Sequence, residues 1–392
     1  MDGNGGSCAR SASAASYSDA AACGSFDAAN DKCQSGDVVL VKQGAYPAQI
    51  LSGSNGRNSA CTFQAAQGET VTVTSLQIQT GANWLTFRNM ADRSGEHTNA
   101  GTTCDTSVCL SGDHVTLDNF DITGPFAHID FENATNTTWQ NSEMGTQGNT
   151  TSIDCHTYDP EPVVAAGGSN ILIDHNTFWQ FQGDHSGCQI HLETMRLFEG
   201  INGITVSNSY FAPNSGDDTA HISSSCVNPS SCTENRNVHI INNYFGELQA
   251  GHAAPDVFFG DNQPCTGWVI AYNFLRNGVW DNCGSETNMI AVGNMGTNNG
   301  GCIVNGTNTH NLWSATNHNT CPGDTWVPGS CTNYICDYTT YNLATDGYHL
   351  TASSPSINAG ENTYCTQYNT NKDIDGKTRT NTCDAGPDEY GN

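Results

Sequence analysis

Acidic and imidazole side chains recur at a fixed distance after four apolar residues in the central part of the sequence. The sixth and seventh residues after Phe178, Phe211, Phe245 and Leu275 include Asp184, His185, Asp217, Asp218, Gly251, His252 and Asp281. Glycoside hydrolysis uses two carboxyls about 5 to 9.5 Å apart, one as the acid and one as the base or nucleophile. Crowding raises the pKa of one carboxyl, which keeps a proton donor available near neutral pH. The pattern predicts an acid/base site, although Gly-Asp and Asn-Gly sequences also form ordinary tight bends.

An imperfect repeat supplies the elements that would position these side chains. Eight segments share an apolar start followed by asparagine, and their first positions are 87, 117, 139, 173, 206, 240, 270 and 291. Residues alternate between apolar and polar within the segments, which is typical of strands. A repeat of this length without a helical pattern predicts a β-solenoid, in which neighbouring coils bury one another's apolar faces. The shortest spacings, 21 and 22 residues, suit a three-sided coil, and the longer ones place extra residues in one loop.

The repeat predicts ladders of similar residues along the solenoid axis. Ile173, Val206, Ile240 and Ile270 are expected to stack in the core, as are Phe178, Phe211, Phe245 and Leu275. Asn176, Asn243, Asn273 and Asn294 are expected to share one bend and to hydrogen-bond through their amides. Because adjacent parallel strands lie about 4.8 Å apart, Asp184 and Asp217 are expected about 5 Å from each other.

The net charge of −27 reflects a shortage of basic residues, since 39 acidic residues face only 12 lysines and arginines. Such a chain lacks the cationic surface that binding to nucleic acid requires. Its field repels polyanions, so an acidic polysaccharide would need a bridging cation, whereas a neutral polymer meets no such barrier. Adaptation to high salt is an alternative cause of the acidity.

Eighteen cysteines are spread along the chain without any C-x-x-C pair. This distribution favours disulfides formed in an oxidising compartment over a zinc ribbon. The opening MDGNGGSC lacks the charged and apolar regions of a signal peptide. We interpret the chain as a mature secreted, extracellular protein whose signal peptide was replaced by Met1. No run approaches the roughly 18 apolar residues of a membrane span.

Both ends of the chain carry distinctive sequences. Residues 26–46 read FDAANDKCQSGDVVLVKQGAY, and the C-terminal part contains YHLTASSPSINAG at 348–360, DIDGKTR at 373–379 and DAGPDEY at 384–390. These sequences resemble secreted right-handed parallel β-helix proteins of the pectin-lyase-like superfamily. The first is similar to their opening, where a short capping helix leads through a Gly-Asp turn into the first strand, and the others are similar to the tails of many bacterial members.

With the repeats, the resemblance implies an all-β chain that forms a single right-handed parallel β-helix with a short N-terminal cap helix. The expected parts are an N-terminal cap region over 1–37, coils over 38–310, and a C-terminal coil, loops and disulfide-stapled cap over 311–392. D373-I-D-G resembles the start of a calcium loop, but the later ligands are missing. A cap turn closed by Cys365 and Cys383 is therefore expected. The fold hosts lyases, hydrolases, epimerases and adhesins, so it does not specify an activity.

The order of acidic residues along the coils also resembles polygalacturonase-type hydrolases. This resemblance implies that Asp217 or Asp218 is the general acid, that Asp184 and the other aspartate hold the attacking water, and that His252 orients the acid. The family's Asn-Thr-Asp is not reproduced at Asp184, and no Arg-x-Lys follows His252 to bind a uronate. The implied substrate is a polysaccharide, neutral or cation-bridged, and hydrolysis requires no cofactor.

Further residues are candidates for lining the same groove. The candidates for substrate binding are His185, Arg196, Tyr210, Tyr244, Arg276 and Asp281. Tyr210 and Tyr244 precede core ladder residues, so their rings could form a platform for sugars or pack beneath a loop.

Two other functions fit the sequence. In a calcium-dependent polysaccharide lyase, Arg196 or Arg276 would remove a proton next to a carboxylate. Calcium held by Asp217, Asp218 and Asp256 would then offset the developing charge. Alternatively, the chain is a non-catalytic adhesin, coat or filament subunit that self-associates, and its acidic side chains face solvent separately.

Overall fold

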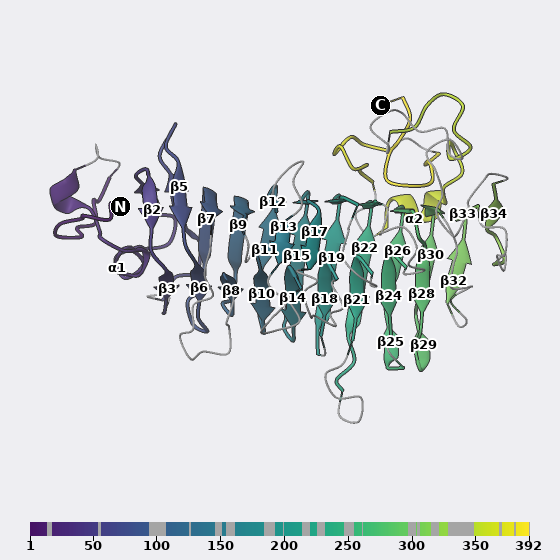
Figure 1. Cartoon of the computed structure of the whole chain (residues 1–392), viewed down its shortest axis with the longest axis horizontal. Coiled ribbons are helices and arrows are strands. Elements are labelled where there is room, and N and C mark those ends of the chain that lie inside the picture. Colours follow the sequence, from purple (N-terminus) through teal and green to yellow (C-terminus); the bar gives the residue numbers. More distant parts are fainter. Residues whose placement is uncertain are drawn as a thin grey trace.

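The computed structural model describes the chain except residues 14–17, 54–55, 94–106, 125–126, 146–150, 154–160, 184–192, 199, 214–219, 226–231, 247–254, 261, 297–302, 304–305, 315–320, 328–348, 368–370, 380–381 and 392. For residues 151–153, 182–183 and 326 it describes the backbone alone. Parallel strands stack along the long axis of the molecule (Figure 1). The all-β parallel architecture expected from the sequence is confirmed.

The strands form three parallel sheets. The nine-stranded sheet consists of β3 (Gln49–Leu51), β6 (Leu76–Ile78), β8 (Val108–Leu110), β10 (Ile129–Glu132), β14 (Val163–Ala166), β18 (Met195–Leu197), β21 (Ile222–Ser224), β24 (Val257–Phe259) and β28 (Val279–Asp281). The two-stranded sheet consists of β13 (Thr151–Ile153) and β17 (Phe181–Gly183).

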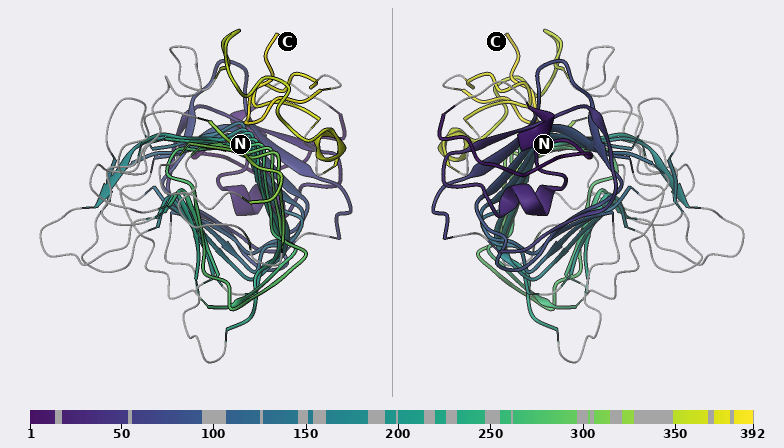
Figure 2. Two further views of the ribbon diagram at one scale, coloured as in Figure 1. Left: turned by 90° about the vertical axis from the view of Figure 1, so that its right-hand side faces the viewer. Right: turned by 90° about the vertical axis from the view of Figure 1, so that its left-hand side faces the viewer.

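The 23-stranded sheet consists of β1 (Val38–Val41), β2 (Gly44–Tyr46), β4 (Cys61–Ala65), β5 (Val71–Val73), β7 (Leu85–Asp92), β9 (Val115–Ile122), β11 (Thr138–Gln140), β12 (Glu143–Met144), β15 (Ser169–Asp174), β16 (Thr177–Phe178), β19 (Asn202–Ser207), β20 (Tyr210–Phe211), β22 (Arg236–Ile241), β23 (Tyr244–Phe245), β25 (Pro264–Thr266), β26 (Val269–Ala271), β27 (Phe274–Leu275), β29 (Ser285–Thr287), β30 (Ile290–Val292), β31 (Met295–Gly296), β32 (Thr307–Thr309), β33 (Leu312–Trp313) and β34 (Thr325–Trp326). A typical coil runs from β14 through β15 and a bend to β16, and the following segment leads to β18 in the next coil. Viewed along the long axis, the coils superpose around a common interior (Figure 2).

All eight repeat segments lie in register, as the sequence predicts. Phe87, Leu117, Trp139, Ile173, Val206, Ile240, Ile270 and Ala291 pair in succession across the larger sheet. Phe178, Phe211, Phe245 and Leu275 form the second predicted ladder. The rings of Phe178, Phe211 and Phe245 stack at 4.5 and 4.6 Å between centroids. The ladder side chains point into the interior of the coils, where each is covered by the equivalent residue of the next coil.

The predicted asparagine ladder is also present, at the bend between the paired short strands. The side-chain oxygen of Asn273 accepts a hydrogen bond from the backbone N–H of Asn243 at 2.9 Å, and Asn294 accepts from Asn273 at 3.0 Å. Nδ2 of Asn273 donates to the carbonyl oxygen of Ile240 at 2.8 Å. Ser142 and Ser209 take the same place in coils without asparagine. The ladder thus satisfies buried backbone groups that strand pairing leaves at each bend.

Replacing Asn273 by alanine is expected to lower the free energy of unfolding by about 2–4 kcal/mol, because several buried polar groups lose their partners. Asn273→Ser should lose less, since Ser142 and Ser209 accept backbone hydrogen bonds at equivalent bends. Urea unfolding followed by circular dichroism measures both variants, with the exposed Asn4→Ala as a control. Equal stability of Asn273→Ala and wild type would contradict this role of the ladder.

Short helices precede the coils at their N-terminal end. Helix α1 (Phe26–Asn30) is capped by the Ser25 side chain, and its Phe26 ring stacks on Phe63 at 5.3 Å, which closes the N-terminal end of the core. A 3₁₀ helix, η1 (Asp19–Ala21), precedes it. Disulfides join Cys8 to Cys23 and Cys33 to Cys61 at this end, and a third joins Cys265 to Cys283. The expected N-terminal cap helix and Gly-Asp entry into the first strand are both present.

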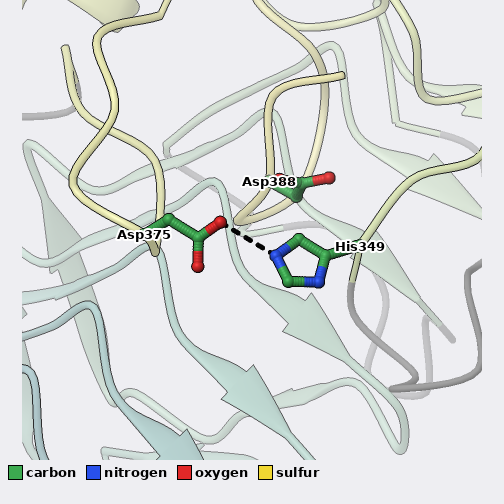
Figure 3. Close-up of side chains that lie close together, drawn as sticks. All are labelled: His349, Asp375 and Asp388. Atoms are coloured by element: carbon green, nitrogen blue, oxygen red, sulfur yellow. Dashed lines mark hydrogen bonds and ion pairs between the residues drawn. The ribbon is translucent and has the colours of Figure 1, made fainter. Parts of the chain in front are cut away.

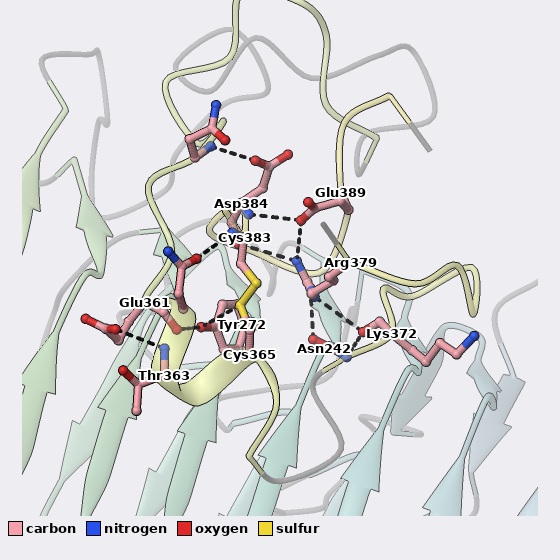
Figure 4. Close-up of a disulfide and its surroundings, with 12 residues drawn as sticks. Asn242, Tyr272, Glu361, Thr363, Cys365, Lys372, Arg379, Cys383, Asp384 and Glu389 are labelled. Atoms are coloured by element: carbon pink, nitrogen blue, oxygen red, sulfur yellow. Dashed lines mark hydrogen bonds and ion pairs between the residues drawn. A yellow bond between two sulfur atoms is a disulfide. The ribbon is translucent and has the colours of Figure 1, made fainter. Parts of the chain in front are cut away.

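The described residues of 349–391 form a C-terminal cap that returns over the larger sheet (Figure 1). Helix α2 (Asn362–Cys365) belongs to it, and the predicted disulfide joins Cys365 to Cys383. The Tyr272 hydroxyl donates to the Glu361 carbonyl oxygen at 2.6 Å, and Arg379 donates to Asn242 Oδ1 at 3.0 Å (Figure 4). The cap is thereby bound to several coils at once. Among the described residues, no helix is long and apolar enough to cross a membrane.

Candidate functional site

Most of the predicted catalytic row falls outside the described residues. This applies to Asp184, His185, Asp217, Asp218 and His252. By sequence they belong to the segments that end at the nine-stranded sheet, between β17 and β18, between β20 and β21, and between β23 and β24. Their convergence stays a prediction.

Asp281 does not share the position expected for that row. It lies within β28, where it pairs in register with the core residue Phe259, and it lines a small cavity with Asn294 and Trp313. Burial raises the pKa of Asp281 to about 6. A fixed sequence offset fails here because only three residues separate β27 from β28, so the sixth residue after Leu275 already lies inside a strand.

Asp256 and Arg276 are buried rather than displayed on a groove. Asp256 is fully buried, and its Oδ2 accepts hydrogen bonds from the backbone N–H groups of Asn277 and Gly278 at 2.7 and 3.2 Å. Burial raises its pKa well above the usual value, and the nearby Arg276 guanidinium offsets this only in part. His221 Nε2 lies 3.8 Å from Asp256 Oδ1, and burial lowers the pKa of His221 to about 4. Asp256 is therefore not available to bind calcium at the surface, contrary to the lyase hypothesis.

Tyr210 and Tyr244, predicted as a platform for sugars, do stack on each other, and Phe274 extends the stack, but Tyr244 is covered. Tyr210, Tyr244 and Phe274 stack in parallel with ring centroids 5.1 and 5.2 Å apart. Tyr244 is only 1% exposed, because it packs in a cluster that includes Leu350 and Ala385 of the C-terminal cap. The structure corrects the interpretation of Tyr244 as a sugar platform, while Tyr210 at the end of the stack is half-buried.

Several charged and polar side chains among the described residues lie on the outer face of the nine-stranded sheet. Strand alternation directs Ile129 and Phe131 into the core, so Asp130 between them points to the opposite face. Asp130, Val164, Arg196 and Ser223 pair in register across β10, β14, β18 and β21. Two strand spacings, about 10 Å, therefore separate the backbones of Asp130 and Arg196.

Arg196 is held by neighbours from adjacent coils. Its Nη1 donates to Oε1 of Glu161, its Nε donates to Ser225 Oγ at 2.8 Å, and its guanidinium lies 4.8 Å from the Phe198 ring centroid. Ser223 Oγ donates to Glu193 Oε1 at 3.1 Å. Glu161 and Glu193 are both almost completely buried. Arg196, predicted to line the groove, does lie on this outer face, together with carboxylates from two coils.

The surroundings of Asp130 on this face shift the pKa of its carboxyl strongly. It is 8% exposed, and within the described part of the chain its Oδ1 has no hydrogen-bond partner. Burial, reinforced by the charge of Glu132, raises the pKa of Asp130 to about 7. Burial also raises the pKa of Glu132, which accepts a hydrogen bond from Asn133 Nδ2 at 2.9 Å. Such a carboxyl can donate a proton at neutral pH.

Sequence reasoning missed Asp130 and Glu132, although a signal was present. In I129-D-F-E132 the apolar and acidic residues alternate, which places both carboxyls on one face of a strand. The asparagine bends that define the repeat lie in the 23-stranded sheet, whereas β10 belongs to the nine-stranded sheet, so the repeat does not indicate this alternation.

A second cluster lies in the C-terminal cap. One potential ligand atom each from His349, Asp375 and Asp388 lies within 4.8 Å of the others (Figure 3). Internal contacts account for this arrangement, since His349 Nε2 is 2.8 Å from Asp375 Oδ2 and the Leu350 N–H donates to Asp388 at 2.7 Å. Lys377 also lies 3.3 Å from Asp375. These contacts join residues within the cap, so the cluster is explained by cap structure and does not indicate a metal site.

Comparison with known proteins identifies the architecture. No protein-family model matches the chain, and no curated protein matches it. The crystal structure of pectate lyase Pel9A superposes over 99% of this chain and 95% of that chain, with a TM-score of 0.50 and 16% sequence identity. The chain has a pectin-lyase-like fold. At 16% identity this similarity concerns the fold alone. The activity depends on the side chains that the fold carries.

Proposed function

We propose that the chain is a carbohydrate-active β-helix protein that hydrolyses a polysaccharide along the outer face of its nine-stranded sheet. The supporting observation is the buried Asp130 carboxyl, whose pKa is raised to about 7 and which shares one face of β10 with Glu132. A general acid is most effective when its pKa lies near the working pH.

Asp130 acts as the acid that protonates the leaving glycosidic oxygen. The base or nucleophile is an ionised carboxylate on the same face, and Glu132 meets this requirement because it lies two residues further along β10. The backbones of residues two apart on a strand are separated by about 6.5–7 Å. Two carboxyls on one face of the strand can therefore lie about 5 to 9.5 Å apart, as glycoside hydrolysis requires.

The aspartates of the connecting segments remain part of the proposal. Asp184 precedes β18, Asp217 and Asp218 precede β21, and His252 precedes β24. These three strands continue the sheet beyond β10 and β14. Asp217 or Asp218 would act as a second acidic group, Asp184 would hold the water, and His252 would orient a carboxyl.

The surroundings of Arg196 favour hydrolysis over elimination. A lyase needs a base that can accept the proton α to a carboxylate, and an arginine in that role must lose its own proton. The buried Glu161 carboxylate bonded to Arg196 favours the charged guanidinium. Arg196 therefore serves better as a fixed positive charge than as a base.

We also propose that the protein works outside the cell or in another oxidising compartment. Four disulfides join described cysteines, and disulfides persist in secreted and extracellular proteins.

A polysaccharide screen with two readouts tests the proposed activity. We expect new reducing ends without ultraviolet absorbance, because hydrolysis forms no C=C bond, and we expect a chelator to leave the rate unchanged. An ultraviolet-absorbing product that disappears with chelator would instead establish the calcium-dependent lyase. Binding to no polysaccharide, with cleavage of none, would favour the non-catalytic extracellular subunit.

A further inference from the structure

An exposed aromatic side chain lies at one end of the nine-stranded sheet. Trp280 belongs to β28, the last strand of this sheet in the part of the chain that the structure describes. Its indole is 51% exposed, whereas every other tryptophan whose side chain the structure describes is buried or half-buried. Burial of a tryptophan ring contributes strongly to folding and to binding, so an indole left open to solvent is available to a ligand.

Strand alternation places Trp280 on the outer face of the sheet. Val257 and Phe259 of β24 point into the core, so Phe258 between them points to the outer face. Phe258 pairs in register with Trp280, and the two rings meet edge to face with centroids 5.9 Å apart. The two side chains therefore form an aromatic pair on the outer face of β24 and β28.

This aromatic pair continues the row that begins at Asp130. The residues between Asp130 and Trp280, one in each successive strand, are Val164, Arg196, Ser223 and Phe258. Five strand spacings, about 24 Å, separate the backbones of Asp130 and Trp280. Val164 and Ser223 are almost completely buried, and Trp280 is the most exposed of these residues. The row is therefore most open to solvent at the end that carries the aromatic pair.

The strand that carries Trp280 is held by its neighbours. Its backbone pairs with β24, and the adjacent Asp281 lines the small cavity beside the core. Cys283 is joined to Cys265 by a disulfide, and its N–H donates to Asp281 Oδ1 at 2.9 Å. The edge-to-face contact with Phe258 restricts the indole further without covering it. The ring therefore loses little conformational freedom when a ligand packs against it.

We infer that Trp280, held by Phe258, binds a sugar ring of the polysaccharide at the open end of the proposed site. A pyranose carries C–H groups on its ring faces and hydroxyls around its edge, so an aromatic ring can cover the apolar face while the hydroxyls stay hydrated. The occupant is the polysaccharide rather than a second copy of this chain, because the aromatic pair lies in line with the Asp130 carboxyl. The inference rests on the proposed function for the identity of the ligand, but it concerns binding and can be tested without turnover.

Affinity electrophoresis in gels that contain soluble xylan, galactomannan, β-glucan or polygalacturonate measures binding. With Asp130→Asn as a background chosen to prevent cleavage, Trp280→Ala should weaken binding of the polymer that is recognised by about tenfold or more, because the contact with the ring is lost. Trp280→Phe keeps an aromatic ring and should lose less. Tyr390→Ala removes a similarly exposed ring, 44% exposed, in the C-terminal cap and should bind as the background does.

Two further readouts separate sugar binding from a structural role of the indole. The polymer should change the tryptophan fluorescence of Asp130→Asn, and this change should be much smaller when Trp280→Phe is added. With Asp130 intact, Trp280→Ala should raise KM for the polymer more than it lowers kcat. Its effect should be larger on long chains than on a disaccharide, which is too short to span the about 24 Å between Asp130 and Trp280.

The outcomes separate this inference from the proposed hydrolysis. Binding that Trp280→Ala weakens, without any cleavage by wild type, would uphold the inference and contradict the hydrolysis. Cleavage with binding and KM unchanged by Trp280→Ala would overturn the inference alone. An altered oligomeric state of Trp280→Ala on size-exclusion chromatography, with unchanged polymer binding, would also overturn it and assign the aromatic pair to a contact between copies. Absence of binding and cleavage for every polymer would contradict both.

Discussion

Asp130→Asn is expected to remove polysaccharide hydrolysis while making the folded protein more stable above pH 7. Asparagine has nearly the same shape as aspartate, so the strand pairing of β10 is retained. It cannot donate the acid proton, and loss of a general acid typically lowers the rate by about 10²–10⁴-fold. The stability gain arises because the wild-type protein must hold an ionised carboxylate at a site that is 8% exposed.

The sign of the stability effect follows from the raised pKa. The pKa of Asp130 is raised from 3.8 to about 7, so the folded state binds this proton more tightly than the unfolded state. The corresponding stability is fully present below about pH 4 and is lost as the pH rises to about 7. The difference corresponds to about 4 kcal/mol as an upper value. Asp130→Asn avoids this loss because its side chain does not ionise.

Thermal and urea unfolding of both proteins at pH 4 and pH 8 measure this effect. The stability advantage of Asp130→Asn should be near zero at pH 4 and largest at pH 8. Asp31→Asn, an exposed carboxylate at the end of α1, is the matched control and should show no such trend. A lower stability of Asp130→Asn at pH 8 would show that an ionised Asp130 is favoured by the fold.

Arg379→Met is expected to destabilise the C-terminal cap by about 3–5 kcal/mol, because it leaves buried partners without their cation. Arg379 is almost fully buried, and its Nη2 donates to Asn242 Oδ1 at 3.0 Å and to the Gly386 carbonyl oxygen at 2.9 Å (Figure 4). Nη1 lies 3.4 Å from Glu389 Oε2, and the guanidinium lies 4.9 Å from the Tyr272 ring centroid. One side chain thus links the cap to two coils.

Release of the cap would expose the Tyr244 and Phe274 rings that it covers. Limited proteolysis should then cut Arg379→Met within residues 349–391 well before wild type, and tyrosine fluorescence should change at a lower urea concentration. Lys377→Met is the matched control, because its ion pair with Asp375 is exposed and such pairs contribute little. Equal protease resistance of Arg379→Met and wild type would show that the disulfide and apolar contacts suffice to hold the cap.

The fold was predictable because one short pattern recurs in every coil. An apolar residue followed by a bend asparagine gives the register of Ile173, Val206 and Ile240 directly, since successive coils repeat the same local packing. The site was less predictable, because the connections between the two sheets vary in length. The same offset that marks Asp217 in a longer connection falls inside β28 at Asp281.

The burial of Tyr244 depends on contacts far apart in sequence. Its ring packs with Leu350 and Ala385, which follow more than a hundred residues later. No local sequence pattern predicts which coils the C-terminal cap covers. Asp130 shows a related limit, since alternation can place its carboxyl on the outer face, but its raised pKa depends on burial that neighbouring coils provide. Local sequence patterns therefore predict the ladders and the face of a strand on which a residue lies. The burial of an individual side chain can be predicted only from the three-dimensional structure.

The pH dependence of kcat/KM on a polysaccharide found by the screen tests the assignment of Asp130 as the acid most directly. For wild type, kcat/KM is predicted to fall about tenfold per pH unit once the pH exceeds about 7, because the acid loses its proton. Folded Asp130→Asn is predicted to retain less than about 1% of this activity at pH 6. A wild-type profile that stays level from pH 6 to pH 9, or an Asp130→Asn variant as active as wild type, would contradict the assignment.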